Sequence, residues 1–197
     1  MRMLSLLTVL ALGATARADE TADFLKADNW EGVKETWKVE GDTIVGKVDV
    51  DPKYNNFLIS KKKYKDFEMS FQVQLKDGKG NSGIQIRSHT VEDKKGPYVV
   101  AGPQADIGAA YWGSLYGEKF GGMMKASDFK KLNVKPTEFN DYSIKVVGKK
   151  VTIKVNGEVA VDEEFPKLPE EGIIAVQIHA GGPMEVTYKN IKFKELK

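Results

Sequence analysis

Apolar and polar residues alternate with a period of two in several stretches of this chain, and this limits the fold more than any other feature. Between residues 67 and 75 the apolar positions are Phe67, Met69, Phe71, Val73 and Leu75, separated by Glu68, Ser70, Gln72 and Gln74. A period of two predicts a β-strand with one face in the core and the other toward solvent or ligand. The same alternation predicts strands at 142–146, 151–155 and 184–188.

Short turns separate these strands. Gly148-Lys149-Lys150 predicts a turn, and Asn156-Gly157 is the pair that tolerates the positive φ angles of a type I′ hairpin. The 19 glycines and 7 prolines leave room for at most one short helix, near Ser127–Leu132. About a dozen short strands predict an all-β fold, a two-sheet antiparallel β-sandwich or jelly roll, because stacked sheets bury their apolar faces without helices.

The first residues have the three parts of a secretory signal peptide. Arg2 is followed by an apolar run over Leu4–Leu12 and by small residues ending at Ala18. We therefore predict a signal peptide over 1–18, a single domain over 19–197, and a periplasmic or secreted protein. No later segment approaches the ~20 apolar residues that a spanning helix needs, so no membrane insertion is expected after cleavage.

Composition removes several classes of function. The chain has no cysteine, which excludes disulfides, thiolate metal sites and cysteine nucleophiles. Without Arg2 and Arg17 the mature chain carries 28 basic and 28 acidic residues, and nucleic acid is not an expected partner. His89 and His179 lack zinc-site spacing, and no phosphate or dinucleotide motif predicts a cofactor. A calcium ion held by separate loops is compatible with the sequence, because such ligands need not be contiguous.

Polar residues break the apolar pattern as i, i+2 pairs on three predicted strands, each beside glycine. If the three strands adjoin, these pairs predict a polar concave surface. The alternative is an ordinary solvated sheet face. Aromatic residues near 111–117 predict either a wall on which a sugar ring stacks or a cap on the sandwich edge. The pairs are Gln85 with Arg87, Gln104 with Asp106, and Gln177 with His179, and the aromatic candidates are Trp112 and Tyr116.

The chain resembles the 3-keto-disaccharide hydrolase domain family, whose fold is a concanavalin A-like jelly roll. The matching segments follow the family's order over nearly the whole mature chain. Departures are Pro103, where many members have an aromatic residue, Phe139 in place of a tryptophan, and Lys119 as the only cation between 118 and 124. The segments are 64–69, 81–87, 104–108, 112–117, 138–142, 156–157 with Asp162, 172–181 and 190–191.

The resemblance implies cleavage of glycosides, such as disaccharides, that are oxidised to a ketone at carbon 3. Ordinary glycoside hydrolysis needs two carboxyl groups, and the central strand offers only Asp106. A 3-ketone instead acidifies the hydrogen on carbon 2, so that a base and an oxyanion stabiliser suffice for elimination, after which water adds back.

On this hypothesis His179 is the base, and Asp106 orients it or is itself the base. Arg87 stabilises the enolate oxygen, and the substrate-binding residues are Gln85, Gln104, Gln177, Trp112 and Tyr116. The alternative function is a lectin-like carbohydrate-binding module without catalysis, using the same groove.

Overall fold

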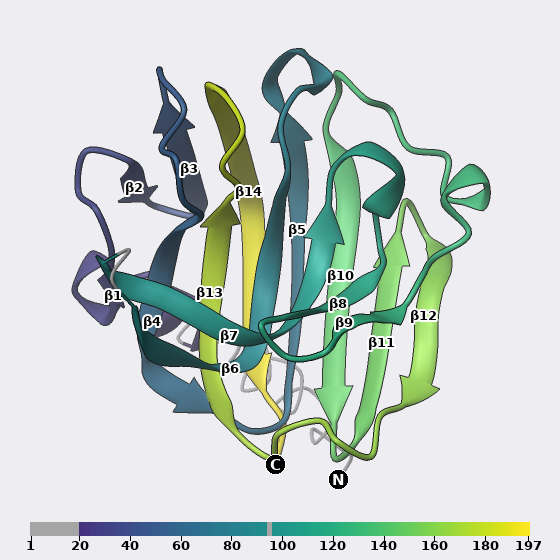
Figure 1. Ribbon diagram of the computed structural model, residues 1–197. Coiled ribbons are helices and arrows are strands. Elements are labelled where there is room, and N and C mark those ends of the chain that lie inside the picture. The colour runs from purple at the N-terminus through teal and green to yellow at the C-terminus, as the bar shows by residue number, and fades with distance from the viewer. Residues whose placement is uncertain (1–19, 94–95) are drawn as a thin grey trace, which may run out of the picture.

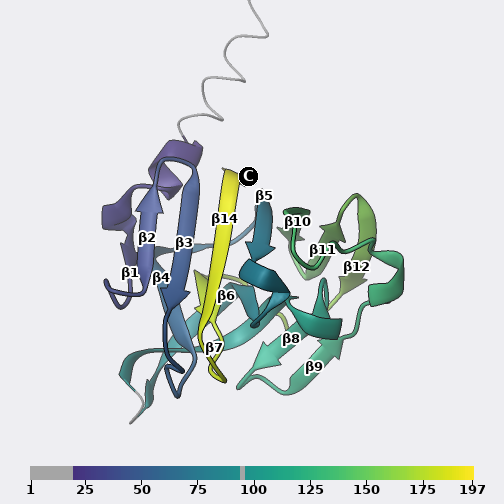
Figure 2. The same ribbon diagram turned by 90° about the horizontal axis from the view of Figure 1, so that it is seen from above.

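The computed structural model describes residues 20–93 and 96–197, which form two antiparallel seven-stranded sheets packed face to face (Figures 1 and 2). This confirms the predicted two-sheet sandwich. The strands of sheet A, in spatial order, are β1 (Trp30–Glu31), β4 (Asn56–Tyr64), β13 (Gly172–Ile178), β6 (Ser82–Asp93), β7 (Gly96–Ile107), β8 (Leu115–Glu118) and β9 (Gly122–Lys125). Those of sheet B are β12 (Glu158–Glu164), β11 (Lys150–Val155), β10 (Asn140–Val147), β5 (Phe67–Leu75), β14 (Met184–Glu195), β3 (Thr43–Val48) and β2 (Trp37–Glu40).

The strands predicted from alternation are present with the expected faces. Along β5 every second residue from Phe67 to Leu75 is buried. The hairpin of β10 and β11 has the two-residue loop Gly148-Lys149, and that of β11 and β12 has Asn156 and Gly157 at φ angles of 50° and 86°. Both angles are positive, as a type I′ turn requires.

Helical structure in the described residues is confined to short turns. The predicted helix near Ser127–Leu132 is a single 3-10 turn, η4 (Phe129–Lys131). Other turns, which the sequence did not predict, lie at residues 20–24 and in η1 (Ala27–Asn29), η2 (Lys76–Gly78) and η3 (Ala109–Tyr111). None of the helices in the described part of the chain is long and apolar enough to cross a membrane. The predicted signal peptide lies outside the described residues.

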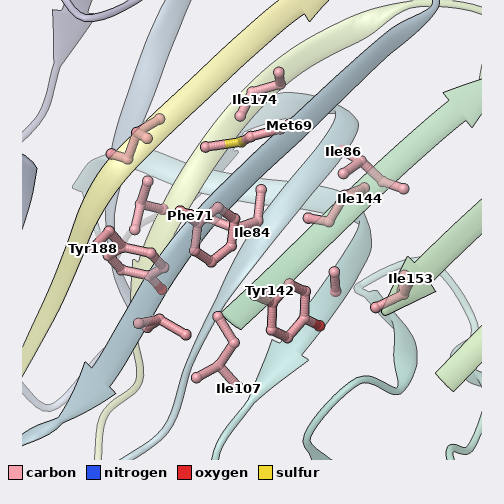
Figure 3. Packing of buried hydrophobic residues seen from close by; sticks show 14 of the residues in the cluster. Met69, Phe71, Ile84, Ile86, Ile107, Tyr142, Ile144, Ile153, Ile174 and Tyr188 are labelled. Carbon is pink, nitrogen blue, oxygen red and sulfur yellow. The ribbon is translucent and has the colours of Figure 1, made fainter. Parts of the chain in front are cut away.

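The core lies between the two sheets and consists of the inward residues of each strand (Figure 3). Sheet A contributes Ile84, Ile86, Ile107 and Ile174, and sheet B packs Met69, Phe71, Tyr142, Ile144, Ile153 and Tyr188 against them. The rings of Phe71 and Tyr142 stack with centroids 5.3 Å apart. The Tyr142 hydroxyl donates to the backbone oxygen of Asp106 at 3.1 Å, which ties sheet B to β7 where the polar residues lie.

The hairpin of β6 and β7 bends sharply halfway along its length. Arg87 adopts a φ of 45° and Gly102 a φ of 143°, and the pairing register shifts between Gln85 and His89. Gly102 is required there because a Cβ would lie 2.2 Å from Ser88 Oγ. Beyond the bend the hairpin turns across β13 and β4 (Figure 1). A second apolar cluster therefore forms on the outer face of sheet A, from Phe57, Ile59, Val100, Ile173 and Ala175, with Tyr98 packed against it.

Candidate functional site

Three adjacent strands, β13, β6 and β7, carry the polar residues predicted to share a face. Gly83 of β6 pairs with Gln177 on one side and with Asp106 on the other, and Gln85 pairs with Gln104. Directly paired residues point to the same side of a sheet. The structure thus brings Gln85, Gln104, Asp106 and Gln177 together on the outer face of sheet A, opposite the core. We call these four residues the outer polar cluster.

Hydrogen bonds connect the side chains of the outer polar cluster through Gln104. Gln85 Nε2 donates to Gln104 Oε1 at 2.9 Å, and Gln104 Nε2 donates to Asp106 Oδ1 at 2.7 Å and to Gln177 Oε1 at 3.2 Å. Ser88 Oγ donates to Gln85 Oε1 at 2.7 Å. Gln85 and Gln104 therefore use both amide atoms within the network, whereas Gln177 uses only its Oε1.

Gly83 makes this arrangement possible because it has no side chain at the centre of the cluster. A Cβ on Gly83 would lie 2.7 Å from both Cγ and Cδ of Gln104. The Gln104 side chain therefore lies over Gly83 and reaches Gln177 on the far strand. In the segment 81–85, Ser82 and Ile84 point inward, and Gly83 leaves space for the side chain of Gln104 on the neighbouring strand.

Gln177 leaves one hydrogen-bonding atom unused although it is completely buried. Its exposed fraction is 0%, and its Nε2 atom has no hydrogen-bond partner among the described residues. Buried polar atoms are nearly always paired, since an unpaired one costs about 1–3 kcal/mol. An unpaired amide end in a polar cluster is what a ligand hydroxyl or carbonyl group would satisfy.

Asp106 is the titratable group of the cluster, and its pKa is strongly perturbed. Burial, with a smaller contribution from the charge of Glu118, raises the pKa of Asp106 to about 7 against the opposing effect of the hydrogen bond from Gln104. Strongly shifted carboxyl groups in polar clusters are typical of functional sites. At neutral pH this carboxyl group can therefore hold or release a proton.

Glu118 is a second carboxyl group at this site that the sequence analysis missed. It lies on β8 opposite Gly102, two positions from Tyr116, which pairs with Gln104. Its Oε2 accepts a hydrogen bond from Asn55 Nδ2 at 3.5 Å. Asn55 directly precedes β4, so the end of β8 lies close to the start of a strand that is not its neighbour in sheet A. The Leu-Tyr-Gly-Glu alternation over 115–118 was the available signal, because it places Tyr116 and Glu118 on one side.

His179 lies at the rim of the site, one residue past the end of β13. Its side chain is exposed, and its Nδ1 atom is 2.5 Å from the backbone oxygen of Ala180. A carbonyl oxygen only accepts, so Nδ1 carries the proton and Nε2 keeps a free lone pair in the neutral ring. The Ala180 backbone N–H donates to Asn55 Oδ1 at 3.1 Å, which connects this rim to the residue that contacts Glu118.

The two predicted aromatic wall residues take different positions. Tyr116 is partly exposed and pairs with Gln104, so its ring lies on the side of the outer polar cluster. Trp112 is 3% exposed and belongs to the main core between the sheets. The segment leaves the sheet after Ile107 through η3, so the position of Trp112 does not follow strand alternation. Trp112 therefore cannot stack on a sugar at this face.

Arg87 does not join the cluster, contrary to the sequence prediction. Its Nη1 donates to the backbone oxygens of Gly148 at 2.6 Å and Pro169 at 2.9 Å, its Nε donates to the backbone oxygen of Lys65, and its Nη2 pairs with Asp66 at 2.6 Å. The side chain is 1% exposed. The bend at Arg87 breaks the alternation with Gln85, so Arg87 is a structural residue that joins three loops and not an oxyanion stabiliser.

Open hollows lie on the outer face of sheet B. Two of them, of about 540 and 1270 Å³, share Asp42, Ser70, Ser143, Lys154 and Lys192 among their lining residues on sheet B and its loops. In the part of the chain that the structure describes, no group of three or more histidine, aspartate or glutamate side chains could hold a metal ion. The calcium site considered from the sequence thus has no candidate cluster of this kind.

Solved structures with the same architecture define the class of fold as a jelly-roll sandwich. The carbohydrate-binding module CBM66 from Bacillus subtilis matches with a TM-score of 0.63 and 17% identity, over 85% of this chain and 96% of its own. A candidate glycosyl hydrolase from Parabacteroides distasonis matches with a TM-score of 0.60 and 19% identity, over 88% and 98%. A galectin-like protein of unknown function from Bacillus subtilis has a TM-score of 0.57 and 10% identity, over 87% and 93%. These likenesses show the fold alone.

Residues 21–194 match the model of the 3-keto-alpha-glucoside-1,2-lyase-like domain, and the chain belongs to this family of carbohydrate-active domains. The match covers nearly all of the predicted mature chain and confirms the resemblance found in the sequence. Among curated proteins, none matches this chain.

Proposed function

We propose that this protein is exported and cleaves glycosides oxidised to a ketone at carbon 3, with the outer face of sheet A as its substrate site. The observation that carries the proposal is the outer polar cluster, where a buried carboxyl group with a pKa of about 7 lies beside a buried amide that has no partner. Membership of the 3-keto-alpha-glucoside-1,2-lyase-like family supports the class of substrate.

In the proposed first step, Nε2 of His179 removes the proton on carbon 2 of the sugar. The electron pair of that C–H bond forms a double bond between carbons 2 and 3, and the ketone oxygen becomes an enolate. When the enolate collapses back to the ketone, a double bond forms between carbons 1 and 2, the bond between carbon 1 and the glycosidic oxygen breaks, and the leaving oxygen takes up a proton. Water then adds to carbon 1 and a proton returns to carbon 2, so the net reaction is hydrolysis.

The roles of the other residues follow from their protonation states and positions. A neutral Asp106 is suited to give its single proton to the leaving glycosidic oxygen, which breaks any hydrogen bond that this proton makes within the cluster. The free amide end of Gln177 is suited to a sugar hydroxyl, and Tyr116 offers its ring beside the cluster. Arg87 has no role in this scheme because its guanidinium group is occupied by Lys65, Asp66, Gly148 and Pro169.

The test uses residues 19–197 with 3-keto-sucrose or 3-keto-trehalose and measures released monosaccharide. We expect release by the unchanged protein and its loss in Asp106→Asn and in His179→Ala. Matched controls are Asp49→Asn and His89→Ala, which alter exposed residues that make none of the cluster's hydrogen bonds and should keep activity. In D₂O, elimination introduces deuterium at carbon 2 of the product, whereas direct hydrolysis does not. Release that survives both site variants would show that the site is elsewhere.

A binding module without catalysis is the alternative function, and the likeness of the fold to the carbohydrate-binding module CBM66 supports it. The same assay separates the two. Binding of the 3-keto sugar by calorimetry with no released monosaccharide would support the module. Cleavage of unoxidised sucrose or trehalose would instead point to ordinary hydrolysis by Asp106 with Glu118.

A further inference from the structure

The direction of the hydrogen bonds in the outer polar cluster depends on how the Gln85 amide group is oriented. The oxygen and nitrogen of an amide occupy interchangeable positions, and the surroundings decide between them. At the end of Gln85 near Ser88, the backbone oxygens of Pro103 and Gly102 lie 3.1 and 3.3 Å away. These two groups only accept. An amide oxygen in this position is repelled by both, whereas an amide nitrogen donates to them and to Ser88 Oγ at 2.7 Å.

Turning Gln85 in this way reverses the donor and acceptor roles of Gln104, Asp106 and Gln177. Its oxygen now faces Gln104 at 2.9 Å, so Gln104 must present its nitrogen there. The other end of Gln104 is then an oxygen, 2.7 Å from Asp106 Oδ1 and 3.2 Å from the Gln177 amide. Two oxygens at 2.7 Å require a proton between them, and only the carboxyl group can supply it.

We propose that Gln85, fixed by the backbone oxygens of Gly102 and Pro103, acts through Gln104 to keep Asp106 a neutral carboxylic acid that donates to Gln104. Gln85 and Gln104 are positioning residues in this relay. Gln177 also turns, its nitrogen donates to Gln104, and its carbonyl oxygen becomes the unpaired end. A buried carbonyl oxygen without a partner is tolerated better than a buried N–H group, which agrees with this direction.

The surroundings of Asp106 agree with a neutral side chain. From β8 the charge of Glu118 opposes ionisation of Asp106, and from β10 the Tyr142 hydroxyl is committed to the Asp106 backbone oxygen. The paired residue on β6 is Gly83, and the cluster residue on β13 is the uncharged Gln177. None of these groups supplies a positive charge that would favour the carboxylate. Burial acts in the same direction.

The relay has a consequence for ligand recognition, and this part rests on the proposed function. With the relay in this direction, the free end of Gln177 accepts a hydrogen bond from a sugar hydroxyl. Ionisation of Asp106 reverses Gln104 and Gln85, and it costs the bonds from Gln85 to the two backbone oxygens. Substrate with a hydroxyl donor at Gln177 therefore binds best while Asp106 is protonated.

The experiment that tests the relay needs no sugar. The pKa of Asp106 is measured by ¹³C NMR of aspartate-labelled protein, residues 19–197, in the unchanged chain and in Gln104→Met and Gln85→Met. If Asp106 donates to Gln104, removing that acceptor destabilises the neutral form, and the pKa of Asp106 falls by about one unit or more. In Gln85→Met the freed Gln104 can turn and donate to the carboxylate, so the pKa of Asp106 is lower in this variant too than in the unchanged chain.

The opposite direction predicts the opposite sign. If Gln104 donates to an ionised Asp106, Gln104→Met removes a bond to the charged form, and the pKa of Asp106 rises. Gln85→Met leaves that bond in place, so the pKa of Asp106 does not fall. A rise or no change in either variant overturns the relay, and Gln85→Met decides the question if Gln104→Met does not fold. Gln72→Met on sheet B is the matched control and should leave Asp106 unchanged.

Activity provides a second readout if the proposed function holds. The upper limb of the pH profile for kcat/KM should move to lower pH in Gln85→Met by the same shift as the NMR value. A Gln85 side chain that only packs would lower kcat/KM without moving this limb. Because the NMR titration is measured without substrate, failure of the relay and failure of the proposed function give different results.

Discussion

Replacement of Arg87 by methionine tests whether this residue supports the fold or acts on substrate. Its guanidinium group is 1% exposed and binds the backbone oxygens of Lys65, Gly148 and Pro169 as well as the carboxylate of Asp66. Removing one partner of a buried charged network costs about 3–5 kcal/mol, because the other groups are left without their donor. The partial exposure of Asp66, at 24%, favours the lower half of this range.

For a chain of this length, 1 kcal/mol corresponds to about 2–4 °C in Tm, so Arg87→Met should lower Tm by roughly 10 °C. Thermal unfolding followed by circular dichroism measures this shift, and Arg87→Lys should lose less because an ammonium group keeps part of the bonding. Well below both midpoints, cleavage of the 3-keto sugar should stay close to that of the unchanged protein. A variant with an almost unchanged Tm and no activity would refute the structural role.

Three further predictions concern the cluster and its surroundings. The pKa of Asp106 is raised from 3.8 to about 7, so the folded state binds the extra proton, and stability should fall by about 4 kcal/mol as pH rises from about 4 to 7 and then level off. Urea unfolding at several pH values should show this fall in the unchanged protein but not in Asp106→Asn, and equal slopes in both would count against the burial of this carboxyl group. Gly83→Ala should displace Gln104, lower stability by roughly 1–3 kcal/mol and weaken sugar binding measured by calorimetry. Trp112→Phe should cost about 1–2 kcal/mol of stability through core packing yet leave KM unchanged, whereas a raised KM with normal stability would place the indole at the substrate.

Local sequence patterns were sufficient to predict the strands and the hairpins. Alternation in Phe67–Leu75 identified β5 and its buried face, and Asn156-Gly157 identified the turn before β12. The same rule placed Gln104 with Asp106, because β7 is regular over that pair. These features depend on neighbours in the chain, so one sequence contains the necessary information.

Features that depend on irregular backbone or distant strands could not be predicted in this way. Arg87 adopts a positive φ at a register shift, so its side chain does not lie on the face that Gln85 occupies. Glu118 lies near the cluster because β8 pairs with β7, and although alternation places Glu118 on one side with Tyr116, it does not show which strands become neighbours. The burial of the cluster also depends on the whole assembled sheet, so alternation alone left open whether these pairs form a concave ligand surface or an ordinary solvated face.

The central claim is that a 3-keto sugar binds at the outer polar cluster of sheet A, and a crystal structure of Asp106→Asn with a bound 3-keto-disaccharide tests it most directly. The account predicts a sugar hydroxyl within hydrogen-bond distance of the Gln177 amide and carbon 2 of the sugar near Nε2 of His179. A sugar found instead in the hollows on sheet B, beside Ser70 and Lys192, would contradict it.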